Sequence, residues 1–282
     1  RSHDDAHARF AYRMLIRTGD ERRMWEVNVE GARNVARVAL RSGIRRMVHV
    51  SSIHAFRCRP GSVVDESTPL ATDAPRGSYD RTKAEGTLAV LGVVRKGLDA
   101  VVAHPTGIIG PHDYLGSLMG RVIRGLASRR VHLIVDGAFD FVDGRDVARG
   151  LVLLAERGRR GEKYILSGTR ATLQELAQLV GEVYGRKVHC IVLPRALAFA
   201  AATVWENLAR RLGIRVQLTR YALQTLTQDC RFTSAKARSE VGYTSRPLRQ
   251  TLADTLKWWG EATGGPRRGS VFANFRAQRE VG

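Results

Sequence analysis

Two side chains that could carry a proton transfer stand four residues apart in the segment Tyr79-Asp80-Arg81-Thr82-Lys83. If this segment is helical, Tyr79 and Lys83 lie on one face of the helix. An ammonium group beside a phenol favours the phenolate and lowers the pKa of the phenol. Tyr79 could then donate and accept a proton near neutral pH.

A serine pair, Ser51-Ser52, closes a short apolar segment upstream of Tyr79. A serine hydroxyl can hold a carbonyl or alcohol oxygen, so the three kinds of side chain together predict proton transfer while a cofactor moves a hydride. An isolated tyrosine–lysine pair of this spacing is more simply a solvated helix pair. The serine pair is the observation that favours a site.

The segments around these residues alternate between helices and strands. Apolar residues recur at helical spacing from about residue 21 and stop at Gly43, and a buried strand is expected over 46–50. Residues 57–77 are rich in Pro and Gly and read as a loop. A helix over 79–97 and a strand over 98–103 follow. This order predicts an α/β fold with a parallel sheet.

The second half of the chain continues the alternation. Thr106–Asp113 reads as a loop at the carboxyl end of a strand, where open parallel sheets bind ligands. Asp146 is expected to be the N-cap of a helix, and Thr172 with Glu175 forms a capping-box pattern. Further elements are expected as helices over 115–129 and 195–212 and as strands over 131–135, 163–166 and 188–193.

Composition restricts the class of protein. With 282 residues, 44% hydrophobic and 26% charged, the chain is long enough for one large domain or two modest ones. The formal charge is +19, and 40 of the 46 basic residues are Arg. Residues 51–150, which hold Tyr79, are nearly balanced, with 13 basic and 11 acidic side chains.

The positive charge invites a nucleic-acid interpretation, but no long basic block interleaved with aromatic residues is present. An Arg-rich solvated surface is therefore favoured over a nucleic-acid interface. Attraction of an anionic ligand or a membrane surface is a weaker alternative. Three cysteines make no disulfide framework and no metal-ligand pattern, which leads us to expect a cytoplasmic protein without a metal. The longest apolar run, Ala196–Trp205, is too short to span a bilayer.

The chain resembles the extended short-chain dehydrogenases/reductases, also called NAD-dependent epimerase/dehydratases, from about residue 26 to 259. Within that family it is similar to the dihydroflavonol reductase and 3β-hydroxysteroid dehydrogenase branch, and to related sugar epimerases. Two positions depart from the family pattern, with Ala32 in place of Thr and His104 in place of Arg. The resembling segments are Asn28–Val35, Val48–Ser52, Tyr79 with Lys83, His104–Pro111, Phe141–Ala148 and residues 237–259.

The resemblance implies roles for individual residues. Tyr79 is expected to be the acid/base, and Lys83 to bind the nicotinamide ribose and tune Tyr79. Ser52 is expected to hold the reacting oxygen, with Ser51 as the second choice, and Asn28 to take part in a proton relay. The cofactor is expected to be NAD or NADP. The residues expected to contact it are Lys83, Tyr79, Pro105, Thr106, Gly107, Ile108 and Ser51.

Other interpretations of single residues stay open at this point. Asn28 is equally well an N-terminal residue of its helix. His104 is more simply a packed residue behind the site than a base. The helices of Asn28 and Tyr79 are those that would form a homodimer, as is common in the resembling family.

The resemblance also predicts the organisation of the chain. An N-terminally incomplete Rossmann-like domain is expected over 1–168, with an atypical stretch over 1–20. A smaller α/β substrate lobe is expected over 169–263, joined by 113–138, with a flexible tail over 264–282. No Gly-rich dinucleotide turn precedes Asn28, so we expect N-terminal strands to be missing and NAD(P) to bind weakly or not at all.

Three functions follow from these expectations. The first is an NAD(P)-dependent oxidoreductase or epimerase acting on a small secondary alcohol or ketone that is steroid-like, flavonoid-like or a nucleotide sugar. The second is a truncated, inactive remnant that serves as an interaction module. The third is a basic nucleic-acid-binding protein.

Overall fold

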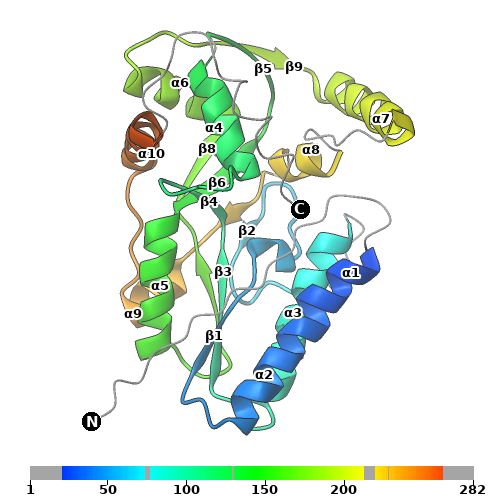
Figure 1. Cartoon of the computed structure of the whole chain (residues 1–282), viewed down its shortest axis with the longest axis vertical. Helices are drawn as coiled ribbons and strands as arrows, with labels where there is room; N and C mark the ends of the chain where they lie inside the picture. Colours follow the sequence, from blue (N-terminus) through cyan, green and yellow to red (C-terminus); the bar gives the residue numbers. More distant parts are fainter. Residues whose placement is uncertain (1–20, 74–76, 129, 213–219, 228, 263–282) are drawn as a thin grey trace. The chain divides into compact units, whose positions relative to one another are not determined.

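The computed structural model describes residues 21–73, 77–128, 130–212, 220–227 and 229–262 of the chain (Figure 1). They form two compact units. Unit 1 comprises residues up to 105 with 150–166 and 232–243, and unit 2 comprises 106–149, 167–231 and the residues from 244 onward. The predicted domain bounds, 1–168 and 169–263 with 113–138, stay a prediction; residues 113–138 and 169–231 belong to the same compact unit, unit 2. The expected atypical start and the expected tail lie outside the described residues.

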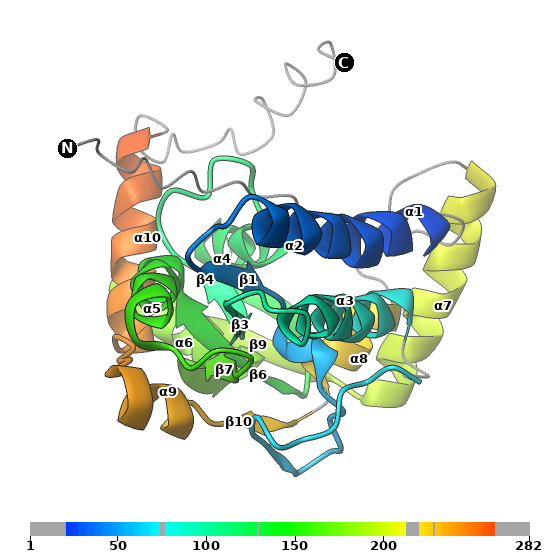
Figure 2. The ribbon, with the colours of Figure 1, turned by 90° about the horizontal axis from the view of Figure 1, so that it is seen from below.

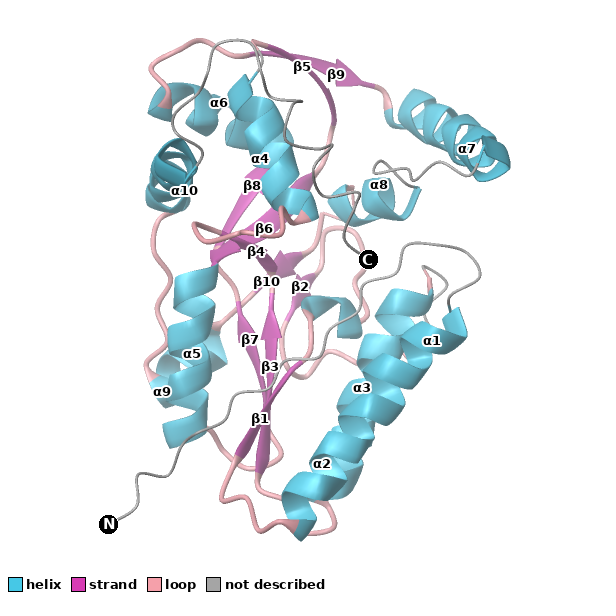
Figure 3. Cartoon of the chain, in the orientation of Figure 1, coloured by secondary structure: helices cyan, strands magenta, loops and turns pink. Residues whose placement is uncertain are grey.

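Figure 3 shows the helices and strands of the chain. The helices are α1 (Glu21–Trp25), the π-helix η1 (Glu26–Gly31), α2 (Ala32–Arg41), the short 3-10 helix η2 (Ile53–Ala55), α3 (Ser78–Val94), α4 (Leu118–Ser128), α5 (Gly144–Arg157), α6 (Leu173–Val183), α7 (Arg195–Leu212), α8 (Arg220–Leu226), α9 (Ala235–Val241) and α10 (Leu248–Ala262). The strands are β1 (Met47–Val50), β2 (Val63–Val64), β3 (Ala100–Pro105), β4 (Gly107–Ile109), β5 (Val131–Val135), β6 (Ala138–Asp143), β7 (Lys163–Leu166), β8 (Thr169–Thr172), β9 (His189–Leu193) and β10 (Arg231–Phe232).

The sheet of unit 1 has the order β1-β3-β7 and is parallel throughout. Every residue of β3 is buried, as expected for a strand between two neighbours in a sheet covered by helices. The α/β fold with a parallel sheet, predicted from the alternation of elements, is confirmed, and the architecture is Rossmann-like.

Two helical segments of unit 1 run side by side (Figure 2). The first is the continuous run of α1, η1 and α2, and the second is α3. Small residues allow the two to approach closely, because Ala36 and Ala39 of α2 are buried against Val90 and Val93 of α3. This pair carries Asn28 on one helix and Tyr79 with Lys83 on the other.

The main sheet of unit 2 has the order β4-β6-β8, with β4 parallel and β8 antiparallel to β6. This corrects the expectation of a loop over Thr106–Asp113, because Gly107–Ile109 pairs with Phe141–Asp143 as a strand. The Gly and Pro content suggested a loop. The pairing with a distant strand overrides that local preference.

The N-terminus of α5 also differs from the prediction. Asp143, immediately before the helix, accepts the backbone N–H of Arg145 at 2.8 Å on its carboxylate, the contact expected of a cap. Asp146 lies inside the first turn, so its expected capping role is wrong. Its carboxylate accepts the backbone N–H of Arg246 at 2.7 Å and the guanidinium of the same residue at 2.9 Å.

The core of unit 2 joins α4, α6 and α10. Ile123, Leu176 and Leu252 are fully buried in one apolar cluster with Trp259. The capping box of α6 is confirmed, with Thr172 accepting the Glu175 N–H at 3.0 Å and Glu175 accepting the Thr172 N–H at 2.7 Å.

Two further findings concern the membrane and the cysteines. Among the described residues no helix is long and apolar enough to cross a bilayer. Cys58 and Cys230 are each disulfide-bonded, which the cysteine count did not predict, whereas Cys190 is free.

Candidate active site

Tyr79 and Lys83 occupy the first turns of α3. Gly77, with a φ of 145° that L side chains rarely adopt, turns the chain into the helix directly before them. The Lys83 Nζ lies 5.9 Å from the centre of the Tyr79 ring, and both side chains are buried. The structure therefore brings the predicted pair together on one helical face, as their spacing indicated.

Burial lowers the pKa of Lys83 from 10.5 to about 8. The charged ammonium loses solvation when it leaves water, and the neutral amine loses much less. A lysine in this state can lose its proton in mildly alkaline solution and stays a cation near neutral pH.

The two serines at the end of β1 have different partners. The Ser51 hydroxyl lies 2.8 Å from the Thr87 hydroxyl and donates to the Lys83 carbonyl at 3.4 Å. The Ser52 hydroxyl oxygen accepts the backbone N–H of His54 at 3.2 Å, which leaves its proton for another acceptor. Ser51 thus connects β1 to α3, whereas the Ser52 hydroxyl makes no hydrogen bond to α3 within the part of the chain that the structure describes.

Asn28 lies in the middle of the π-helix η1, and π-helical turns are frequent at functional sites. Within the described residues, helix already extends from Glu21 to Trp25 before η1, so the alternative of Asn28 as an N-terminal helix residue is wrong. Its side-chain amide donates to the Thr82 hydroxyl at 3.1 Å, and this hydroxyl donates to the Tyr79 carbonyl at 3.0 Å. Asn28 is therefore hydrogen-bonded into the turn that carries Tyr79.

His104 is a packed residue behind the site, as the simpler interpretation had it. Its ring is fully buried, with its centre 4.6 Å from that of Phe56. Burial lowers the pKa of His104 to about 3, so the ring is neutral. Because the Ser52 carbonyl can only accept, the His104 Nδ1 at 2.9 Å must donate to it.

Sequence reasoning missed three further side chains in unit 1, namely His54, Asp80 and His49. The His54 Nδ1 lies 3.2 Å from an Asp80 carboxylate oxygen, and the His54 ring meets that of Tyr79 edge to face at 5.5 Å. His54 and Asp80 are neighbours in sequence of predicted residues, Ser52 and Tyr79, which was the available signal. His49 of β1 is also buried, and burial lowers its pKa to about 4.

Residues 105–108, predicted to contact the nicotinamide, run from the last residue of β3 into β4. Pro105 ends β3 in unit 1, and Thr106, Gly107 and Ile108 belong to unit 2. Thr106 is buried, and its hydroxyl has no hydrogen-bond partner among the described residues. A buried hydroxyl without a partner is costly, and a bound amide group would satisfy it, so this residue fits the cofactor expected there.

The acidic and basic side chains at the end of β6 and the start of α5 form an ionic network. Asp143 accepts from the Arg145 guanidinium at 2.7 Å, and the same guanidinium reaches Asp254 at 2.7 Å. Burial raises the pKa of Asp143, but the hydrogen bonds from Arg145 outweigh it and hold the pKa below its usual value. These contacts tie α5 to α10 within unit 2.

The comparisons with known proteins agree on the family. The sequence model of the NAD dependent epimerase/dehydratase family matches residues 16–167. The chain is 33% identical over 248 residues to sterol demethylase protein B of Methylococcus capsulatus, covering 87% of this chain and 76% of that protein. It is 28% identical to the decarboxylating sterol-4-alpha-carboxylate 3-dehydrogenase of Saccharomyces cerevisiae, covering 83% of this chain and 71% of that protein.

The crystal structure of gox2253 is 32% identical to the chain with a TM-score of 0.75, covering 92% of this chain and 78% of that one. The chain therefore belongs to the NAD-dependent epimerase/dehydratase family. It is an oxidoreductase of that family, whose cofactor is NAD or NADP and whose substrates are small molecules.

The lowered pKa of Lys83 gives a testable dependence of stability on pH. The unfolded lysine binds its proton up to about pH 10.5, and the folded one only up to about 8. Between these values the unfolded chain holds more protons, so stability rises with pH. We expect Lys83→Met to be more stable than the natural protein at pH 7, and this advantage to shrink above pH 8.

Urea unfolding at a series of pH values measures this difference. Lys257→Met, at an exposed lysine of α10, is the matched control and should show no such trend. An advantage of Lys83→Met that stays constant with pH would contradict the burial of a charged ammonium at this position.

Proposed function

We propose that the chain catalyses hydride transfer between NAD(P) and a secondary alcohol or ketone through Ser52, Tyr79, Lys83 and Asn28. The observation that carries the proposal is the buried Tyr79–Lys83 pair, with a lysine pKa lowered to about 8 and a separation of 5.9 Å between Nζ and the phenol ring. A phenol and an ammonium ion sharing a buried face are suited to general acid–base catalysis.

When bound, the nicotinamide supplies the acceptor or donor for the hydride. The residues of the chain handle the proton and the oxygen. The Ser52 hydroxyl donates a hydrogen bond to the reacting oxygen, and Tyr79 takes the proton from an alcohol or returns it to a ketone. The Lys83 ammonium stabilises the phenolate of Tyr79, and we expect it to bind the nicotinamide ribose.

Asn28 and His104 support these groups from behind. The Asn28 amide holds the Thr82 hydroxyl, and that hydroxyl holds the Tyr79 carbonyl; we propose that the amide also takes part in returning protons to the site. His104 fixes the Ser52 carbonyl, and therefore the direction in which the Ser52 side chain leaves the end of β1. The proposed cofactor contacts are Ser51, Tyr79, Lys83, Pro105, Thr106, Gly107 and Ile108.

The names of two relatives favour a sterol-like substrate over a nucleotide sugar, since both refer to sterols. We propose an apolar secondary alcohol or ketone of that class. The cytoplasmic location stays a prediction, and the disulfide bonding of Cys58 and Cys230 is unusual for that compartment. The test is to mix the protein with NAD⁺ or NADP⁺ and a 3β-hydroxysteroid, a dihydroflavonol or a nucleotide sugar in turn, and to follow the absorbance of the reduced cofactor.

We expect reduction of the cofactor with the steroid and, because no Gly-rich turn precedes Asn28, only weak cofactor binding by calorimetry. Binding of neither cofactor together with no turnover on any of the three would favour the inactive remnant over the enzyme. Turnover of the nucleotide sugar alone would keep the chemistry and overturn the substrate class.

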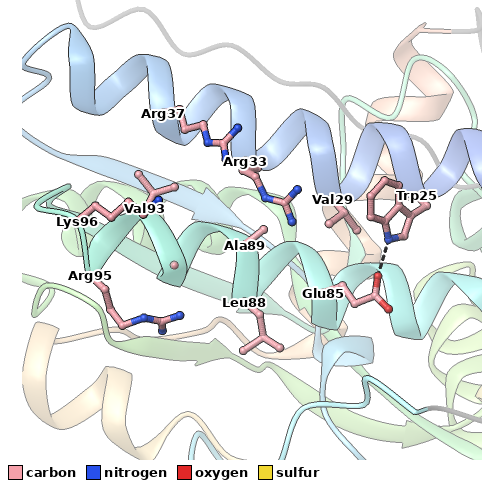
Figure 4. Close-up of a pocket in the computed structure, with 11 residues that line it drawn as sticks. Trp25, Val29, Arg33, Arg37, Glu85, Leu88, Ala89, Val93, Arg95 and Lys96 are labelled. Carbon is pink, nitrogen blue, oxygen red and sulfur yellow. Dashed lines mark hydrogen bonds between the residues drawn. The ribbon is translucent and has the colours of Figure 1, made fainter.

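We propose in addition that the chain forms a homodimer through α2 and α3. A groove of about 610 Å³ lies between η1–α2 and α3. Val29, Leu88 and Ala89 are among its apolar lining residues, and Arg37 and Lys96 are among its charged ones (Figure 4). Val35, Val38 and Leu88 expose large apolar side chains on these two helices. Covering them with a second copy would remove that area from water.

Light scattering behind a sizing column tests the dimer. We expect the natural chain to elute with twice the mass of one chain, and Val38→Glu to elute as a monomer. Val152→Glu, at an equally exposed valine of α5, is the control and should remain dimeric. A monomeric natural chain would exclude the homodimer.

A further inference from the structure

Helix α7 of unit 2 has two different apolar faces. One face is small and buried, with Ala198 and Ala202 packed against Val135 and Leu223. The other face is large and exposed, and carries Leu197, Val204, Trp205 and Leu208. A helix that needs only to cover its own unit has no use for the second face.

The exposed residues form a continuous stripe. At about 100° of turn per residue, Leu197, Val204 and Leu208 fall within about 40° of one another, and Trp205 extends the stripe to about 100°. Val204 is 69% and Leu197 61% exposed. The helix has 18 residues, so the stripe follows a rod about 27 Å long.

Adjacent elements of unit 2 add to this apolar surface. Pro194 alone separates α7 from β9, which pairs in parallel with β5 so that Ile191 lies opposite Leu133. Both side chains are exposed. The order β9–α7–α8 can be followed in Figure 1.

The positive charge of α7 and of the residues that follow it indicates which kind of partner fits the stripe. From residue 195 to 228 the sequence contains five arginines and one acidic residue, Glu206. An apolar stripe with a tryptophan, beside an excess of arginine, is the composition of helices that lie in the interface of an anionic membrane. A neutral protein partner would use the apolar stripe alone, whereas an anionic lipid surface uses both the stripe and the positive charge.

We propose that α7 is an interfacial helix that lays its Leu197–Val204–Leu208 face on the surface of an anionic membrane. The helix lies on the bilayer and does not cross it, in line with the absence of a spanning helix among the described residues. This proposal does not depend on the chemistry of Tyr79. If the substrate is sterol-like, as proposed above, membrane binding through α7 would hold the enzyme at the bilayer, where such a substrate dissolves.

Co-sedimentation of the full chain with vesicles tests the proposal. We expect binding to vesicles of phosphatidylcholine with phosphatidylglycerol, and weaker binding to phosphatidylcholine alone. High salt should weaken the part that depends on phosphatidylglycerol, since it screens charge. Val204→Glu should weaken binding roughly tenfold, because it places a charge on the stripe in place of an apolar side chain that the membrane would bury.

Val152→Glu, at a valine of α5 that is 56% exposed, is the matched control and should bind as the natural chain does. Circular dichroism of both variants checks that they fold. Failure to bind either kind of vesicle, or an equal effect of the two substitutions, would overturn the proposal. Self-association that Val204→Glu abolishes in the absence of lipid would also overturn it, since a second copy would then cover the stripe.

Discussion

Replacement of Tyr79 by Phe is expected to reduce hydride transfer about a thousandfold, within the range found for loss of a positioned acid or base. Phenylalanine keeps the ring, its edge contact with His54 and its place on α3, and removes only the hydroxyl that exchanges the proton. Binding of the cofactor should change little, because the Lys83 ammonium remains. Steady-state turnover with whichever of the three candidate substrates is active measures hydride transfer, and calorimetry measures cofactor binding separately.

Tyr184→Phe is the control for this variant, because Tyr184 is an exposed tyrosine that follows α6. It should leave both turnover and cofactor binding unchanged. Unaltered turnover in Tyr79→Phe would remove Tyr79 from the reaction. The general acid would then have to be sought elsewhere in the site, and His54 with its Asp80 partner would be the next candidate.

Replacement of Gly86 by Ala is expected to destabilise the fold by roughly 2–3 kcal/mol, the usual cost of overpacking. A Cβ at Gly86 would lie 2.4 Å from the carbonyl oxygen of Asn28, which is backbone and cannot turn aside. Either η1, which carries Asn28, or α3, which carries Gly86, must therefore move. The higher helix propensity of alanine offsets only about 1 kcal/mol of this cost.

Gly92→Ala, on the same helix, provides a control of opposite sign. Its Cβ would meet only the far end of the Arg95 side chain, at an ordinary contact distance of 3.7 Å. We expect a gain of about 0.5–1 kcal/mol from helix propensity. Urea unfolding of the two variants measures both effects, and equal stabilities would contradict the close contact between Gly86 and Asn28.

The Gly86 variant also reports on the site. Asn28 holds Thr82 through its side chain and meets Gly86 with its backbone. A displacement of η1 should therefore lower turnover in the part of the protein that remains folded. This loss should be smaller than that of Tyr79→Phe, because the phenol hydroxyl is still present.

Much of the fold could be predicted from local patterns. A spacing of four places Tyr79 and Lys83 together on any α-helix, and the structure has them so. The capping box of Thr172 and Glu175 is likewise contained in four consecutive residues. Such features depend on the geometry of one turn, which adjacent residues determine by themselves.

Other features depend on residues far apart in the chain. Asp146 was predicted to cap its own helix, and in the structure it binds Arg246. Gly107–Ile109 reads as a loop by composition and becomes a strand by pairing with β6. A local sequence pattern does not show which distant residue will contact a given side chain or strand. These two assignments therefore required the tertiary structure.

The candidate site divides in the same way. The sequence by itself determined which residues could exchange a proton and that a parallel sheet would support them. Only the tertiary structure decided that the Ser51 hydroxyl is hydrogen-bonded to the Thr87 hydroxyl, whereas the Ser52 hydroxyl has no hydrogen bond to α3 among the described residues. It also decided that burial lowers the pKa of Lys83 to about 8. Hydrogen-bond partners and loss of solvation arise from packing between separate elements, and packing exists only once the chain has folded.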